Sequence, residues 1–410
     1  MKTIRGLISA GIGLLAVAIL AGAPGAHADV VTDANARAAD VVSRLPAPPI
    51  TIRMMAIVQV SVFEAVNAVT GRYPPQRAKL SPAPGASVEA AVAAATRTAL
   101  SKLMPAQQAA IDADYQALLG SVPDGPAKTA GIALGEQAAA AIVALCADDG
   151  MVAPDVYRPH TAAGIYVPTV GPATPHWGKR RPWVMPRGDH FRPGPPPGLT
   201  SDTWARDYNE IKAVGSRTST QRTPEQTAIA QFWEATAPVV YWPIARSVAG
   251  APGRDVTDNA RLFALAAMAM DDALIAVFDG KYTYHLWRPV TAIRNGDLDG
   301  NNATERDPGW TPFISTPMHP EYPCAHCIVA GALGAVLAAE IGSGPTPKLS
   351  STSPTGGAVR TWTSVADFTK EVAQARIYDG VHYRTSTEVG SAMGKKIGEL
   401  AAKSVPKVTR

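Results

Sequence analysis

The stretch Val256–Asp279, VTDNARLFALAAMAMDDALIAVFD, shows a helical pattern and sets the expectation for the fold. Period-two alternation, which would indicate strands, is scarce along the rest of the chain, and no internal repeat is visible. The other segments with a helical pattern are residues 50–69, 86–103, 107–119, 126–147, 201–213, 224–235, 323–341, 365–378 and 387–402. We therefore predict an all-α fold in which the helices pack around a common core.

The domain organisation follows from one change of composition. Residues 153–200 are dense in Pro, Gly, Trp and Arg, which predicts a long irregular excursion over one face of a helical bundle. We expect a single all-α domain over residues 29–410, with N-terminal helices in 29–150, the excursion in 153–200 and a C-terminal bundle in 201–405. Two separate bundles, 29–150 and 200–405, are the alternative. Within the excursion, Trp177, Trp183 and Arg187 are hypothesised to roof a pocket.

Residues 1–28 have the pattern of an export signal. Lys2 and Arg5 precede an apolar run, and Ala26-His27-Ala28 is a small-x-small cleavage pattern. An N-terminal membrane anchor is the alternative, although the run is short for a membrane span. We expect an exported protein, periplasmic or extracellular, with no membrane span after cleavage.

Charge and cysteine content exclude some partners. Removing Lys2 and Arg5 from the 38 basic residues leaves 36 against 34 acidic ones, which favours neither nucleic acid nor a membrane surface as a partner. Three cysteines cannot build a disulfide framework. Cys324-Ala-His-Cys327 could close one bridge, hold two buried thiols, or form a thiol–disulfide exchange site at a helix start.

Five cationic or titratable side chains lie in three short segments near the C-terminal end: Lys281, Arg288, His326, Arg376 and His382. Lysine and arginine supply donors that match the oxygens of a tetrahedral oxyanion, and histidine titrates near neutrality. Lys281 and Arg288 are seven residues apart, which would place both on one helical face; a solvated basic stripe is the alternative.

The other three residues are placed by helix boundaries. Pro323 favours a helix start, so His326 would lie in the first turn, where free backbone N–H groups attract anions; a structural histidine is the alternative. Asp379-Gly380 suggests a chain break between Arg376 and His382, which would let two elements present them to one point.

The order Lys-x6-Arg-Pro, Pro-x-x-His, Arg-x5-His resembles the vanadium-dependent haloperoxidase and type 2 phosphatidic acid phosphatase superfamily. The segments WRPVTAIRNGD, DPGWTPFISTPMHPEYP and ARIYDGVHYR are similar to the secreted bacterial haloperoxidase-like branch. The resemblance covers roughly residues 255–402. It implies small-molecule substrates, namely hydrogen peroxide, a halide and an organic acceptor or a phosphoester, and it is consistent with a homodimer.

The resemblance implies a role for each position. His382 would be the vanadium ligand, Lys281, Arg288 and Arg376 would bind the vanadate oxygens, and His326 would be the acid–base group. In a phosphatase, His382 would instead be the nucleophile and His326 would protonate the leaving group, with phosphate in place of vanadate. A non-catalytic oxyanion binder is a third reading.

Two residues are candidates for a halide or substrate pocket. His319 matches a histidine of bromide-oxidising members, which favours bromide, and Trp287 is a further candidate.

The chain departs from the family pattern at three positions. The usual Pro-Ser-Gly-His has Cys324 and Ala325 in place of Ser and Gly, so a weaker S–H donor and a backbone N–H would have to bind the oxyanion. An orienting Asp often found four residues after the ligand histidine is Ser386 here, and Asp379 or Glu388 is expected to compensate.

A segment from Asp297 to Asn301, DLDGN, resembles a short calcium loop but lacks the full spacing of an EF-hand. A turn is the favoured interpretation, and a calcium site is not expected.

Overall fold

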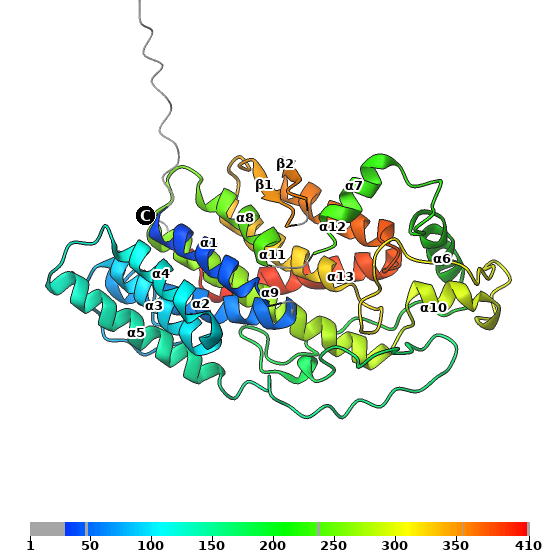
Figure 1. Cartoon of the computed structure of the whole chain (residues 1–410), viewed down its shortest axis with the longest axis horizontal. Coiled ribbons are helices and arrows are strands. Elements are labelled where there is room, and N and C mark those ends of the chain that lie inside the picture. The colour runs from blue at the N-terminus through cyan, green and yellow to red at the C-terminus, as the bar shows by residue number, and fades with distance from the viewer. Residues whose placement is uncertain (1–28, 46–47, 236–237, 355, 408–410) are drawn as a thin grey trace, which may run out of the picture.

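The computed structural model describes residues 29–45, 48–235, 238–354 and 356–407 (Figure 1). Helices dominate this part of the chain, which confirms the predicted all-α class. The α-helices are α1 (Val30–Val42), α2 (Pro48–Thr70), α3 (Val88–Leu103), α4 (Gln108–Leu119), α5 (Pro126–Cys146), α6 (Asp202–Val214), α7 (Pro224–Phe232), α8 (Pro238–Ala249), α9 (Val256–Tyr284), α10 (Pro289–Arg294), α11 (Ala325–Ile341), α12 (Val365–Tyr378) and α13 (Arg384–Ser404), with short 3-10 turns η1 (Pro105–Gln107), η2 (Trp177–Lys179) and η3 (Gly296–Leu298).

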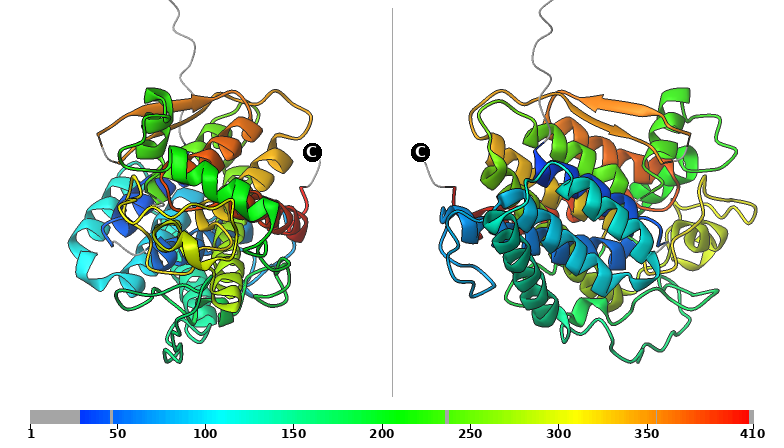
Figure 2. Two further views of the ribbon diagram at one scale, coloured as in Figure 1. Left: turned by 90° about the vertical axis from the view of Figure 1, so that its right-hand side faces the viewer. Right: turned by 60° about the vertical axis from the view of Figure 1, so that its left-hand side comes forward.

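Each predicted helical segment lies on an observed helix, and the pattern missed α1, α8 and α10. It also missed a small antiparallel hairpin of β1 (Leu349–Thr352) and β2 (Val359–Trp362), in which Leu349 pairs with Trp362. The hairpin lies at the opposite side of the molecule from the irregular excursion (Figure 2).

The core is built around α9 and α11, which are buried along most of their length. α9 packs against α2, α11 and α13, and one continuous hydrophobic cluster includes residues from α1 through to Val405. A helix that is apolar on all sides needs neighbours on all sides, which explains the central place of α11. The proposed division of the domain into segments stays a prediction.

Glycine permits the closest contact between helices, that of α11 with α13. A Cβ at Gly394 would overlap the carbonyl oxygen of Ile328, and one at Gly398 would overlap that of Ala332. The two backbones therefore approach more closely than side chains would allow. This contact fixes the direction of α11, whose N-terminus carries His326.

Two adjacent acids on α9 hold the excursion against the bundle. Asp271 accepts hydrogen bonds from Arg180 Nη1 (2.8 Å) and Trp183 Nε1 (2.8 Å). Asp272 accepts the backbone N–H groups of Trp183, Val184 and Met185 at 2.6–2.9 Å. Both carboxylates are fully buried, and a buried carboxylate persists only when it is paired or hydrogen-bonded.

The predicted export signal, residues 1–28, lies outside the described residues. By length and composition alone, two helices of the described chain could cross a membrane, α2 and α5, which the sequence reading did not anticipate. The most apolar window of α2 is 89% buried inside the protein, as in a core helix, and that of α5 is 39% buried. The absence of a membrane span after cleavage stays a prediction.

Candidate oxyanion site

Lys281 and Arg288 approach each other through a chain reversal, and the predicted common helical face is wrong. α9 ends at Tyr284, His285 adopts a left-handed backbone with φ 53°, and Arg288 is the N-cap of α10. Lys281 lies in the last turn of α9, where the helix dipole favours a cation. Its ammonium is fully buried and donates to the backbone carbonyls of Pro320 (2.9 Å) and Glu321 (2.8 Å).

Arg288 connects two loops of the site. Its Nε donates to the carbonyl of His319 (2.8 Å) and its Nη1 to the carbonyl of Val381 (2.8 Å). Nη1 also lies 3.5 Å from His382 Nε2, and Nη2 lies 2.9 Å from His319 Nδ1. Because guanidinium has a rigid set of donors, it fixes both histidine-bearing loops relative to each other.

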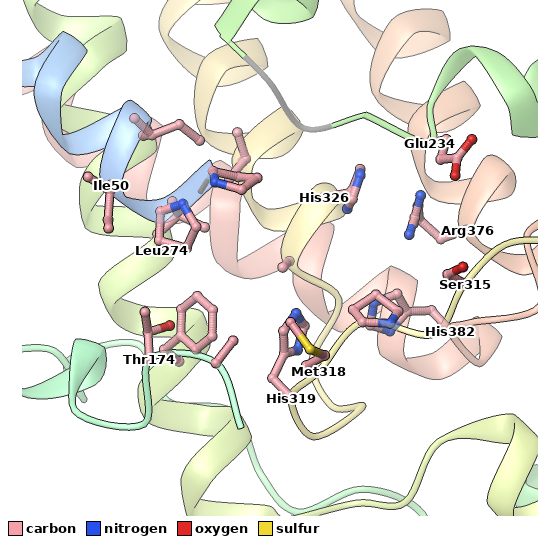
Figure 3. Close-up of a pocket in the computed structure, with 18 of the residues that line it drawn as sticks. Ile50, Thr174, Glu234, Leu274, Ser315, Met318, His319, His326, Arg376 and His382 are labelled. Atoms are coloured by element: carbon pink, nitrogen blue, oxygen red, sulfur yellow. The ribbon is translucent and has the colours of Figure 1, made fainter. Parts of the chain in front are cut away.

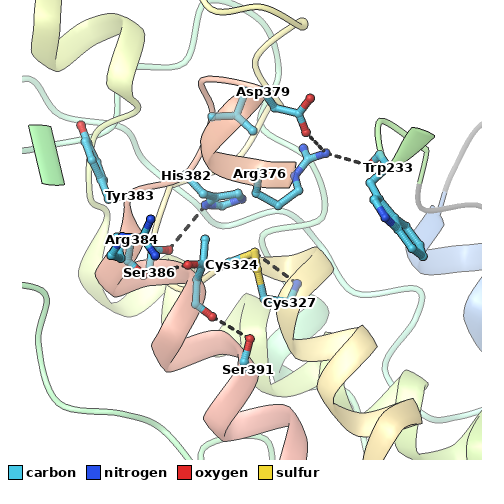
Figure 4. Close-up of a disulfide and its surroundings, with 12 residues drawn as sticks. Trp233, Cys324, Cys327, Arg376, Asp379, His382, Tyr383, Arg384, Ser386 and Ser391 are labelled. Carbon is cyan, nitrogen blue, oxygen red and sulfur yellow. Dashed lines mark hydrogen bonds and ion pairs between the residues drawn. A yellow bond between two sulfur atoms is a disulfide. The ribbon is translucent and has the colours of Figure 1, made fainter. Parts of the chain in front are cut away.

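His382 is oriented by a carboxylate that the sequence reading missed, that of Glu321. Glu321 Oε1 lies 2.8 Å from His382 Nδ1 and also accepts the backbone N–H of Tyr383 at 2.9 Å. Ser386 Oγ is 3.5 Å from the same Nδ1, the limit of a hydrogen bond (Figure 4). A proton on Nδ1 leaves Nε2 as the nitrogen that can hold a ligand. Glu321 thus supplies the charge that Ser386 lacks.

The expected substitutes for the orienting acid were wrong. Asp379 instead forms an ion pair with Arg376, with Oδ2 2.7 Å from Nη1, and both side chains are fully buried. Glu388 lies exposed on α13. The sequence contained a signal for Glu321. This glutamate lies in the run HPEYPCAH, which leads into a buried apolar helix, and a buried glutamate needs a partner.

Arg376 lies in the last turn of α12, just before a tight turn of the chain, which agrees with the predicted break. α12 stops at Tyr378, and Gly380 has φ +78° with no room for a Cβ against the carbonyl of Gly215. Arg376 Nη1 donates to the carbonyl of Trp233 (2.9 Å), whereas its buried Nε has no partner in the described structure. The Nε donor of the guanidinium therefore remains for a ligand.

His326 lies in the first turn of α11, one residue after Ala325, and Pro323 precedes the helix. His326 is buried, and its Nε2 has no hydrogen-bond partner in the described structure. The N–H groups of Ala325 and His326 have no acceptor within the helix, since the first turn has none to offer. The start of α11 therefore offers two backbone donors and one imidazole nitrogen.

Cys324 and Cys327 form a disulfide, which selects the bridge among the readings of that motif (Figure 4). Cys324 is the N-cap of α11, and its sulfur accepts the backbone N–H of Cys327 at 3.1 Å. A bonded sulfur has no proton to donate, so in this form the Cys324 side chain cannot serve as the expected S–H donor to an oxyanion.

Burial and mutual repulsion dominate the electrostatics. Burial first, then the charge of Arg288, lowers the pKa of Lys281 well below its ordinary value. Burial also lowers the pKa of Arg288 to about 10 and the pKa values of His319, His326 and His382 well below 6.5, with nearby cations adding to each histidine shift. A bound anion would relieve this repulsion, because an opposite charge favours the protonated forms.

A cavity of about 410 Å³ opens beside these groups (Figure 3). His326, Arg376 and His382 line it, together with Ala325 and the predicted pocket residue His319. Lys281 and Arg288 are not among its lining residues, and they hold the loops that carry Glu321, His319 and Val381. The structure thus brings the five predicted residues into one region, while their chemical roles stay predictions.

Other predicted pocket residues lie elsewhere. Trp287 is buried and stacks on Trp204, with ring centroids 6.1 Å apart, and it does not line the cavity. Trp177 and Trp183 are packed into the hydrophobic core, and Arg187 pairs with Asp189 on the surface. The hypothesis of a Trp–Arg roof is therefore wrong.

The excursion meets the cavity at Ala173 and Thr174 instead. The backbone N–H of Ala173 donates to the carbonyl of Met318 (2.6 Å), and its carbonyl accepts from the Tyr282 hydroxyl (2.6 Å).

The resemblance of residues 297–301 to a calcium loop has a structural explanation. The Asp299 carboxylate accepts hydrogen bonds from Trp204 Nε1, the Thr304 hydroxyl and the backbone of Asn301. Its oxygens are thus engaged in holding a turn. Among the described residues, no group of three or more His, Cys, Asp or Glu side chains could hold a metal ion.

Comparisons with known proteins match the part of the chain that carries these residues. A family model described as the second helical-bundle domain of VCPO matches residues 261–410. The vanadium chloroperoxidase of Curvularia inaequalis is 28% identical over 193 residues, a match that covers 39% of this chain and 31% of that protein.

Solved structures agree over a longer span. The chain is similar to the first bacterial vanadium-dependent iodoperoxidase, with 25% identity and a TM-score of 0.77 over 92% of this chain and 96% of that one. An apo-type bacterial vanadium-dependent chloroperoxidase shares the fold, with 17% identity and a TM-score of 0.72 over 88% and 94% of the two chains. The chain is thus similar to vanadium haloperoxidases in sequence over part of its length, including residues 261–410, and shares their fold over most of it.

Proposed function

We propose that this protein is a vanadate-dependent haloperoxidase that uses hydrogen peroxide to oxidise a halide, with vanadate held by His382. The observation that carries the proposal is the fixed imidazole of His382, whose Nδ1 meets Glu321 and whose Nε2 faces a cationic cluster. When bound, vanadate would supply the activation of peroxide that halide oxidation requires.

The residues present fit such an oxyanion. Lys281, Arg288 and Arg376 bring three buried cations, against the two buried carboxylates of Glu321 and Asp379. Arg376 Nε and His326 Nε2 are buried without partners in the described structure, and such groups are costly unless a ligand satisfies them. The start of α11 adds the N–H groups of Ala325 and His326.

Each residue then has a distinct task. Glu321 holds the proton of His382 on Nδ1 and keeps Nε2 available as a ligand. Arg376 and the start of α11 bind oxyanion oxygens, and Lys281 and Arg288 contribute charge from behind. Burial and the charge of Arg376 lower the pKa of His326, and a bound oxyanion would oppose that shift and let Nε2 hold a proton for transfer. His319 lines the cavity, and bromide remains the expected halide.

Phosphomonoester hydrolysis is the second candidate, and one observation favours it. A nucleophilic histidine needs an orienting carboxylate, and the pair of Glu321 with His382 provides one at 2.8 Å. His382 Nε2 would attack phosphorus, and His326 would protonate the leaving group. A protein that only binds oxyanions is the outcome if neither reaction occurs.

Export across a membrane stays part of the proposal.

The test uses the chain purified without thiol reductant, so that the disulfide stays intact and vanadate is not reduced. We expect bromination of a diketone reporter with vanadate, peroxide and bromide, and loss of turnover in His382→Ala. His160→Ala, which removes an exposed histidine, is the matched control and should retain activity. Hydrolysis of p-nitrophenyl phosphate without bromination would favour the phosphatase, and vanadate binding with neither reaction would leave a binding protein.

A further inference from the structure

One methionine differs from all the others in the described chain by its exposure to solvent. The sequence has ten methionines, and Met1 lies outside the described residues. Of those that the structure describes, Met318 is 51% exposed, Met151 is half-buried, and the rest are at most 6% exposed. A thioether is oxidised only where the oxidant reaches its sulfur, so Met318 is the described methionine most open to attack.

Met318 also lines the cavity that His326, Arg376 and His382 line (Figure 3). A side chain that faces the cavity and is half exposed to solvent lies where the cavity meets the solvent. Figure 3 shows it beside His319, the next residue of the chain. A small molecule that leaves the cavity on this side therefore passes the thioether of Met318.

Hydrogen bonds hold the backbone of Met318 at this rim. Its carbonyl accepts the N–H of Ala173 at 2.6 Å, and the N–H of His319 donates to the carbonyl of Pro317 at 2.9 Å. Arg288 donates in turn to the carbonyl of His319 at 2.8 Å. The methionine side chain itself is unbranched and flexible, so its sulfur can turn toward the cavity from a fixed backbone.

The described residues that line the cavity offer no other sulfur atom, no tryptophan and no tyrosine. Cys324 and Cys327, near the start of α11, are joined in a disulfide and fully buried, and each of the eight tryptophans is at most 7% exposed. The histidines of the lining can take up halogen at nitrogen, but an N–halogen bond passes its halogen on to a thioether. An oxidant formed in the cavity thus meets one thioether.

We propose that Met318 is a modification site, at which hypohalous acid formed by the enzyme oxidises the thioether to methionine sulfoxide. The inference rests on the proposed haloperoxidase function and adds an acceptor for its product within the protein itself. The sulfoxide places a polar and chiral group at the rim of the cavity, and methionine sulfoxide reductases can reverse its formation.

The step balances with the reactants that the proposed function supplies. Hydrogen peroxide, bromide and one proton give hypobromous acid and water. The sulfur of Met318 donates an electron pair to bromine as the Br–O bond breaks and hydroxide leaves. Water then forms the S–O bond, bromide departs with the electron pair of the S–Br bond, and two protons are released. The sulfur loses two electrons, peroxide gains them, and bromide is regenerated.

Proximity favours capture at Met318 over reaction in solution. One thioether in a volume of about 410 Å³ corresponds to a local concentration of about 4 M. Millimolar free methionine is far more dilute than this. It should therefore remove hypobromous acid from the solution without competing for hypobromous acid that is still inside the cavity.

The experiment maps sulfoxide at every methionine by peptide mass spectrometry, in two arms. In the first arm, limiting reagent hypobromous acid is added to the resting protein without vanadate. We expect at least about tenfold more sulfoxide at Met318 than at Met151 or at any buried methionine, and protection of Met318 by millimolar free methionine. In the second arm, vanadate, peroxide and bromide act with the same free methionine present. Met318 should still be oxidised there, and leaving out bromide should prevent it.

Met318→Leu and Met151→Leu are the matched variants, because leucine replaces methionine with little change of volume. In the second arm the wild type and Met151→Leu should each gain one oxygen atom, and Met318→Leu should gain none. Melting curves of both variants confirm that they are folded.

The failure of this proposal and that of the haloperoxidase can be told apart. If reagent hypobromous acid oxidises Met151 or a buried methionine as readily as Met318, the assignment is overturned whatever the protein catalyses. If the protein brominates the diketone but free methionine protects Met318 during turnover, capture at the rim is overturned and the haloperoxidase is kept. If neither the diketone nor Met318 reacts in the second arm, the haloperoxidase and the capture of its product are both rejected.

Discussion

Replacing Glu321 with glutamine tests whether the carboxylate that contacts His382 Nδ1 strengthens the binding of vanadate by that histidine. One oxygen of Glu321 engages both His382 Nδ1 (2.8 Å) and the N–H of Tyr383 (2.9 Å), whereas the other has no hydrogen-bond partner in the described structure. A glutamine oxygen can keep both contacts. The change therefore removes the charge and largely preserves the shape.

The magnitude follows from the difference between two kinds of hydrogen bond. A bond to a charged group contributes about 1.5–3 kcal/mol and a neutral one about 0.5–1.5 kcal/mol, so losing the charge costs about 1–1.5 kcal/mol. That corresponds to about a tenfold loss of affinity, and removing the partner of a metal-binding histidine commonly costs about 10–100-fold. We expect Glu321→Gln to weaken vanadate binding within that range.

The assay is isothermal titration with vanadate at about pH 8.5 and without thiol reductant. Burial raises the pKa of Glu321 to about 7 while Lys281 and Arg288 oppose the shift, so at this pH the wild-type carboxylate is charged. Ser386→Ala is the control, and because Ser386 Oγ is 3.5 Å from Nδ1 it should weaken binding less than about threefold.

Restoring a carboxylate at position 386 provides the rescue. The double variant Glu321→Gln with Ser386→Asp should regain most of the lost affinity, since the side chain at position 386 already reaches to 3.5 Å from the same Nδ1. A folded Glu321→Gln protein that binds vanadate with the wild-type dissociation constant would refute the reasoning.

Three further predictions concern stability and reactivity. Burial raises the pKa of the Cys146 thiol to about 12, so iodoacetamide at pH 8 should leave the native protein unmodified. Mass spectrometry should count one added group after denaturation, and three after denaturation with reduction of the disulfide. Modification of the native protein would contradict this. Asp271→Asn should lower the free energy of unfolding in urea by about 1.5–3 kcal/mol, because it removes one of the two buried carboxylates paired with Arg180 while Asp149 keeps the other, whereas Asp189→Asn at a surface pair should cost less than about 1 kcal/mol. Gly394→Ala should cost about 1–3 kcal/mol, because its Cβ would overlap the backbone of α11, and Gly120→Ala, with 3.4 Å to its nearest atom, should change the melting temperature little; equal effects would disprove the close contact.

The sequence was enough to identify all the long helices except α1 and α8, and to single out the cationic residues, since both leave local patterns. Lys281 and Arg288 were singled out by their residue types, and the structure places them in one region, yet their predicted relative geometry was wrong because α9 ends at Tyr284. That stop depends on a left-handed residue which a periodic pattern does not reveal. The local sequence therefore pointed to Lys281 and Arg288 but did not predict the chain reversal that brings them together.

Contacts between distant segments were beyond the sequence. Glu321 and His382 are 61 residues apart, and only the packed loops bring them together. Trp177 was misread because a tryptophan in a Pro-rich segment looks like a surface residue, whereas its large ring fills the core. The adjacent acids Asp271 and Asp272 inside an apolar helix were an unused signal, because such acids must find partners.

The attachment of the excursion to Asp271 and Asp272 has a consequence for protein engineering. These contacts divide the excursion into two shorter loops. Lengthening either loop costs little, because the entropy of closing a loop grows only slowly with its length. The stretch around Val156, which is 64% exposed, can therefore accept an inserted peptide or reporter domain at low cost. An insertion between residues 180 and 185 would instead separate backbone donors from their buried carboxylates, and one at Thr174 would change the entrance to the cavity.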